Sequence, residues 1–178
     1  MMQRLCFAWP CLLALNVYAA SPATEVPKEL DALKQLAGTW EGTSRKGQNP
    51  EQKASVVYEI TSGGTAVTSK LFPGQPHEMI SVYHKEGKSV GMTHFCAAGN
   101  APQMVLKKAD GKTMTFEIQK SEGLSSPSES HMHAVTLTMV DANTLQEEWS
   151  QFENGKKTDA VTFNFKRIGT AAPAPKAP

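Results

Sequence analysis

Apolar residues alternate with polar ones along most of this 178-residue chain, and residues that favour turns arrive about every ten positions. Successive side chains of a strand point to opposite faces, so this alternation predicts strands with one buried face and one exposed face. The clearest strands are residues 53–61, 113–119 and 160–166. Asp110-Gly111 and Asn154-Gly155 predict tight hairpins, because Gly, Asn and Asp tolerate the positive φ of primed turns.

The pattern predicts about ten sequential antiparallel strands. A sheet that is apolar on one face throughout covers that face and removes its edges by closing on itself. We therefore predict an all-β fold, a single up-and-down antiparallel β-barrel, with a two-sheet sandwich as the structural alternative. A short helix is expected before it, because Leu30, Leu33 and Leu36 recur every third position between residues 26 and 37. The expected strands lie near residues 39–45, 53–61, 65–72, 77–85, 88–96, 102–109, 113–119, 130–140, 144–152 and 156–167.

The two ends of the chain differ from this region. Residues 1–20 carry Arg4, then an apolar run, then small residues at Ala19 and Ala20, which is the layout of a secretory signal peptide. We expect a periplasmic or secreted protein, with a lipid anchor through Cys11 as the alternative. The barrel domain is expected over residues 26–169. Residues 170–178 alternate Ala and Pro, which is typical of an extended, solvated tail.

The charge, the length of the apolar run and the cysteine content limit which partners and cross-links we expect. The chain has 18 basic and 17 acidic residues with no basic block, so nucleic acid is not an expected partner. The N-terminal apolar run is too short for a membrane span. Loss of residues 1–20 would remove Cys6 and Cys11 and leave Cys96 as the only cysteine, so we expect no intramolecular disulfide. The sequence does not indicate the oligomeric state.

The segment Leu36-Ala37-Gly38-Thr39-Trp40-Glu41-Gly42 resembles the Gly-x-Trp opening of the calycins, the superfamily of lipocalins, fatty-acid-binding proteins and nitrobindins. The resemblance implies that Trp40 packs at the closed end of the barrel beneath an Arg near the end of the last strand, where this chain has Arg167. A guanidinium over an indole is favourable by roughly 0.5–2 kcal/mol. Gly38, Trp40 and Arg167 are therefore expected to close the barrel.

Other segments refine the resemblance. Residues 94–102 and 131–133 look like those of exported bacterial lipocalin-like proteins of unassigned function. Ser44 stands where the nitrobindin opening has a third Gly. The haem-ligating His of nitrobindins lies close to the C-terminus, and this chain has no His after His133, so the matched residues do not support haem.

Histidines supply the candidate site. His94 and Cys96 share a strand face with Val90 and Met92, whereas His131 and His133 share one with Val135, Leu137 and Met139, so all four side chains are expected to point into the barrel. Inside, they would contact a ligand together with Tyr58. Imidazole and thiol groups also suit zinc or copper, so His94, His131 and His133 are the candidate metal ligands. The third interpretation is a buried structural network.

These observations predict an exported carrier or sensor that holds a small apolar or amphipathic molecule in an apolar barrel cavity. Two alternatives stay open. One is a metal-binding protein or metal-dependent enzyme that uses the three histidines, and the other is an interaction module without a ligand. We expect no catalytic residue, because Cys96 and His94 on one strand have no obvious oxyanion hole beside them.

Overall fold

The structure is a computed structural model that describes residues 26–119 and 123–170. The expected signal peptide and the Cys11 anchor lie outside the described residues, as does the expected tail beyond residue 170. None of the helices in the described ranges is long and apolar enough to cross a membrane.

The described residues form one α-helix, one short 3-10 turn and eleven strands. Every strand that the alternation predicted is present, with ends shifted by at most three residues, although the last predicted strand, 156–167, is divided in two. The elements in chain order are α1 (Lys28–Lys34), β1 (Gly38–Lys46), β2 (Gln52–Thr61), η1 (Ser62–Gly64), β3 (Ala66–Leu71), β4 (Met79–Glu86), β5 (Ser89–Phe95), β6 (Gln103–Ala109), β7 (Thr113–Ile118), β8 (His131–Asp141), β9 (Thr144–Glu153), β10 (Lys156–Lys157) and β11 (Val161–Thr170).

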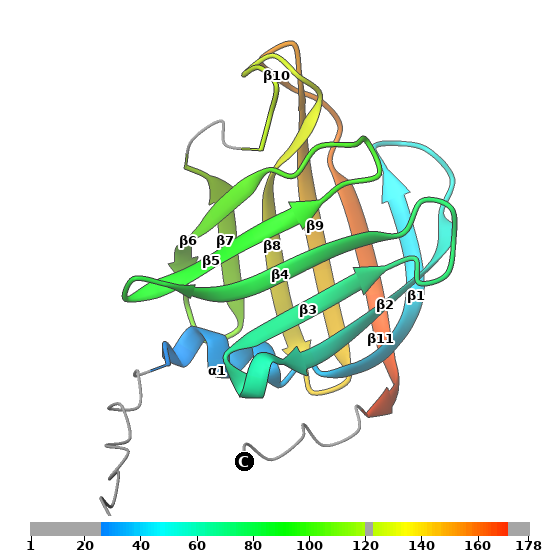
Figure 1. Ribbon diagram of the computed structural model, residues 1–178. Helices are drawn as coiled ribbons and strands as arrows, with labels where there is room; N and C mark the ends of the chain where they lie inside the picture. The colour runs from blue at the N-terminus through cyan, green and yellow to red at the C-terminus, as the bar shows by residue number, and fades with distance from the viewer. Residues whose placement is uncertain (1–25, 120–122, 171–178) are drawn as a thin grey trace, which may run out of the picture.

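The sheet closes into the predicted up-and-down barrel. Each strand from β1 to β9 pairs antiparallel with the next along the chain, and β11 lies between β9 and β1. The ladder is therefore continuous around ten strands (Figure 1). The tight turn expected at Asn154-Gly155 is present, with φ of 52° and 71°. It joins β9 to the two-residue β10, and the chain then bends before β11 begins at Val161.

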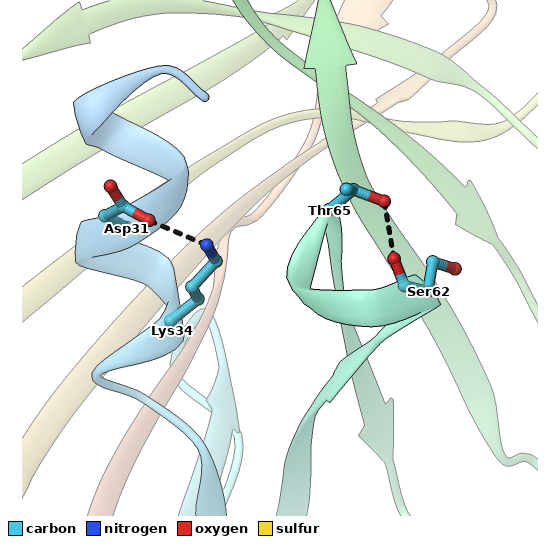
Figure 2. Close-up of polar contacts among 4 residues, drawn as sticks. All are labelled: Asp31, Lys34, Ser62 and Thr65. Atoms are coloured by element: carbon cyan, nitrogen blue, oxygen red, sulfur yellow. Dashed lines mark hydrogen bonds and ion pairs between the residues drawn. The ribbon is translucent and has the colours of Figure 1, made fainter. Parts of the chain in front are cut away.

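Helix α1 lies across one end of the barrel (Figure 1). Leu30, Leu33 and Leu36 are fully buried there, so the apolar stripe that predicted the helix packs against the core. Figure 2 shows polar contacts on the outside of this end: Lys34 pairs with Asp31 at 2.7 Å, and the Thr65 hydroxyl donates to the Ser62 carbonyl at 2.8 Å. We call this helix-covered end the closed end, and we call the opposite end, where β5, β7 and β9 finish, the open end.

Arg167 links β11 to the closed end. Its guanidinium carbon lies 4.0 Å from the centroid of the Trp40 ring. Its nitrogens donate to the carbonyl oxygens of Ala37 at 2.7 Å, Gln35 at 2.8 Å and Ala142 at 3.0 Å. The Trp40 indole donates to the Leu36 carbonyl at 2.8 Å. One side chain therefore holds the end of the helix, the first strand and the β8–β9 turn together.

Replacing Arg167 with Lys tests this contact. Lysine keeps the charge but has no planar guanidinium to lie on the Trp40 ring and donate several hydrogen bonds at once. Arg167→Lys should therefore lower the free energy of unfolding by about 1–3 kcal/mol. Arg45→Lys is the matched control, because Arg45 pairs with Glu51 on the surface and such pairs contribute less than about 1 kcal/mol. Urea unfolding of the three proteins measures the difference. Equal losses in both variants would show that Arg167 is an ordinary surface cation.

Gly42 allows β1 to approach β11, since a Cβ built there would overlap the main-chain oxygen of Asn164. Gly42→Ala should therefore force the two strands apart and cost about 2 kcal/mol or more of unfolding free energy. Gly169→Ala, in the same strand pair, is the control, because its nearest neighbour, the Thr39 Cβ, would lie at an ordinary 3.8 Å. Thermal unfolding compares the two. A wild-type midpoint for Gly42→Ala would contradict the close approach.

Candidate functional site

His94 lies inside the barrel near the open end. Its side chain is 2% exposed, and its ring centroid is 4.5 Å from that of Trp149 on β9, across the lumen. The Nδ1 atom is hydrogen bonded to the Ser81 hydroxyl at 2.9 Å, whereas the buried Nε2 atom has no partner. Burial lowers the pKa of His94 to about 4, so the ring is neutral at pH 7. Among the described residues, the Tyr83 hydroxyl and Asn100 Oδ1 are the other buried side-chain atoms without a hydrogen-bond partner, and such atoms are rare in proteins.

A buried carboxyl group lies on β9, two residues before Trp149. Glu147 is 2% exposed, and its two oxygens accept hydrogen bonds from the Tyr58 hydroxyl at 2.7 Å and the Trp149 indole at 2.9 Å. Burial raises the pKa of Glu147, and the two donors oppose that rise. Burial, together with the Glu147 charge, raises the pKa of Tyr58 well above its usual value. Tyr58 therefore points inward as expected, but its hydroxyl is already occupied by Glu147.

The middle of the lumen is filled by aromatic side chains. Tyr83 and Phe116 meet edge to face with centroids 5.4 Å apart, and both are fully buried. The Tyr83 hydroxyl has no hydrogen bond of good geometry, although the hydroxyls of Ser69, Tyr58 and Ser81 are near enough to moderate the rise that burial causes in the pKa of Tyr83. Buried side chains therefore fill this layer of the lumen.

The open end carries a collar of apolar side chains that are only partly buried. Its members pack against the core from the strand ends and loops at that end, whereas the leucines of α1 at the closed end are fully buried. This mouth collar, as we call it, lies at the open end of the barrel. It consists of Phe72, Met79, Ile118, Met132 and Val161.

The prediction that His131 and His133 point into the barrel is wrong. Met132 pairs with Gln151 and Ala134 with Ser150, so His133 is an extra residue that forms a β-bulge in β8. An extra residue reverses the alternation, and Met132 is consequently the side chain that packs against the core. His131 pairs with Phe152, which lies on the opposite face of β9 from the inward Trp149.

The two histidines form a separate cluster outside the lumen. His131 Nε2 lies 3.1 Å from His133 Nδ1, and His131 Nδ1 lies 2.6 Å from the Glu129 carbonyl oxygen. The Phe152 ring stacks on His133 with centroids 3.9 Å apart. Burial and the neighbouring His131 lower the pKa of His133, although Glu117 opposes this. His131 is only 5% exposed although it lies outside the lumen, so burial alone does not place a residue in the lumen.

The structure therefore does not bring His94 together with His131 and His133. Within residues 26–119 and 123–170, no three side chains of His, Cys, Asp or Glu gather as metal ligands. Cys96 follows β5 immediately at the open end and is partly exposed. A groove of about 200 Å³ lies elsewhere, on the outer face of β4–β6 over Gly91, and its lining does not include His94.

Sequence reasoning missed Glu147, Trp149 and Ser81. The signal for Glu147 was present, because Leu145, Glu147 and Trp149 are two apart and the first and last are apolar, which places the carboxylate on the inward face. Ser81 follows from the register, since it stands directly opposite His94 on β4. No pattern in the sequence indicates that the Nε2 atom of His94 lacks a hydrogen-bond partner.

Comparisons with known proteins add little. No family model matches the sequence, and no curated protein matches it. Among the solved structures that match is a redesigned β-barrel with 11% sequence identity and a TM-score of 0.40; the match covers 76% of this chain and 94% of that chain.

The buried neutral His94 predicts a pH dependence of stability. Its pKa is about 4 in the folded protein and 6.5 in the unfolded chain, so only the unfolded chain takes up this proton between those values. The stabilisation is present above pH 6.5 and declines as the pH falls toward 4, by about 3 kcal/mol over the interval. Denaturant unfolding of wild type and His94→Gln at several pH values checks this. Parallel curves for the two proteins would contradict it.

Proposed function

We propose that this protein is an exported, calycin-like binding protein that holds a small apolar or amphipathic molecule at the open end of its barrel. The observation that carries the proposal is the buried Nε2 atom of His94, which has no partner beneath a collar of apolar side chains. A polar ligand group that reached this nitrogen would satisfy it, and leaving such a group unpaired costs about 1–3 kcal/mol.

The calycin part of the proposal rests on the opening motif and its partner. Gly38, Trp40 and Gly42 begin β1, and the guanidinium of Arg167 lies over the Trp40 ring. Export rests on the signal-like layout of residues 1–20. A carrier or sensor outside the cytoplasm suits a barrel whose apolar mouth can take up a molecule from solution.

The packing around His94 limits the ligand. Trp149 lies against the His94 ring, and Tyr58 and Glu147 are bonded to each other one layer deeper. A long chain running down the lumen would have to displace these groups. The proposal is therefore a short molecule whose apolar part contacts the mouth collar, here Phe72, Met79 and Met132, while its one polar group reaches His94.

Two fluorescent probes test the proposal. The anionic 8-anilinonaphthalene-1-sulfonate and the uncharged N-phenyl-1-naphthylamine share an apolar body and differ in the polar group. Both should bind saturably with one equivalent. His94→Leu should lower the affinity for the anionic probe about three- to tenfold more than the affinity for the uncharged probe, as expected for the loss of one hydrogen bond.

His84→Leu is the matched control, because His84 lies on β4 in the lining of the outer groove and not in the lumen. It should leave the affinities of both probes unchanged, and near-ultraviolet circular dichroism should show that all three proteins are folded. Absence of saturable binding would favour an interaction module without a ligand. An equal effect of the two substitutions would place the ligand elsewhere.

A further inference from the structure

Two sulfur atoms meet at the mouth of the barrel. Met79 begins β4, and Cys96 follows β5 at the place where the β4–β5 register, which pairs Ile80 with Phe95, puts the two opposite each other. The Cys96 Sγ atom lies 4.0 Å from the Met79 Sδ atom. Two sulfurs that share one ion at about 2.3 Å each lie about 4 Å apart when the angle between them is near 120°. The sulfurs are therefore spaced as a pair of ligands would be.

A nitrogen donor lies two positions farther from the open end in the β4–β5 ladder. His94 is opposite Ser81 in the register and two residues before Cys96, and its inward imidazole offers an Nε2 atom that is buried and has no partner. Its Nδ1 atom is held by the Ser81 hydroxyl at 2.9 Å, which fixes the ring. A metal-bound histidine commonly has its second nitrogen held in this way.

We propose that Cys96, Met79 and His94 form a binding site for a soft monovalent cation, namely Cu(I). Thiolate and thioether ligands select Cu(I) over the harder divalent ions, and imidazole is compatible with it. The thioether of Met79 is the third ligand of this set, and with the Cys96 sulfur it makes the set soft.

The surroundings of Cys96 suit ligation. The Ala98 main-chain N–H donates to Sγ at 3.5 Å and so orients the sulfur. Binding releases the thiol proton to solvent, and the thiolate charge then balances that of Cu(I), with no electron transferred. The side chain is partly exposed, so the ion can reach it from the open end. This inference does not depend on the small-molecule function, with which it shares His94 and the collar residue Met79.

Anaerobic titration of the protein with Cu(I) against the chromophoric chelator bicinchoninate tests the site. The full chain carries Cys6→Ser and Cys11→Ser, so that Cys96 is its only thiol. This protein should withdraw one equivalent of Cu(I) from the chelator. Cys96→Ser should abolish the withdrawal, and Met79→Leu and His94→Gln should each weaken it about tenfold or more. Met132→Leu and His84→Gln, matched in residue type but outside the site, should bind as the parent does.

Binding of the uncharged naphthylamine probe separates this site from the proposed function. Cys96→Ser should retain that binding while it loses Cu(I), which also shows that the variant is folded. Met79 belongs to the mouth collar, so Met79→Leu keeps an apolar side chain there. The inference is overturned if the parent protein fails to compete with bicinchoninate, or if Cys96→Ser or Met79→Leu competes as well as the parent.

Discussion

The approach of β1 to β11 is the contact on which the rest of the barrel depends. A sheet of ten strands with one apolar face is stable only if its edges meet, and here they meet where Gly42 leaves no side chain against the Asn164 main chain. Arg167 then ties β11 to Trp40 and to the end of α1. Helix α1 covers this end, whereas strand ends and loops border the opposite end.

The polar side chains of the lumen lie in its middle and toward the open end. Near the helix the core is leucine and aromatic, and in the middle Glu147 is fully engaged by Tyr58 and Trp149. The Tyr83 hydroxyl in the middle and His94 Nε2 nearer the open end both lack a hydrogen-bond partner. Ser81 holds one side of the ring and Trp149 packs against it, so the imidazole is fixed with its free nitrogen available to a partner. Both proposals, for a small molecule and for Cu(I), follow from that arrangement.

The sequence predicted the fold better than the site, for a definable reason. Period-two alternation and the turn residues depend on local chemistry, so the strands, the hairpin at Asn154-Gly155 and the closed barrel followed from it. The inward direction of His94 followed too, because β5 is regular. The alternation failed at His133, where one bulged residue reverses every side chain on its N-terminal side. A bulge is set by pairing with a distant strand, which single-strand patterns do not contain.

The central claim is that His94 is a fixed, neutral imidazole whose free nitrogen meets whatever enters the barrel. Nitrogen-15 spectra of the histidine rings, recorded from pH 7 to pH 4 with and without the anionic naphthalenesulfonate probe, measure this directly. The account predicts that His94 stays neutral until the pH is near 4 and that its ring nitrogens respond to the probe. A His94 signal that titrates near 6.5, or one that the bound probe leaves unchanged, would contradict it.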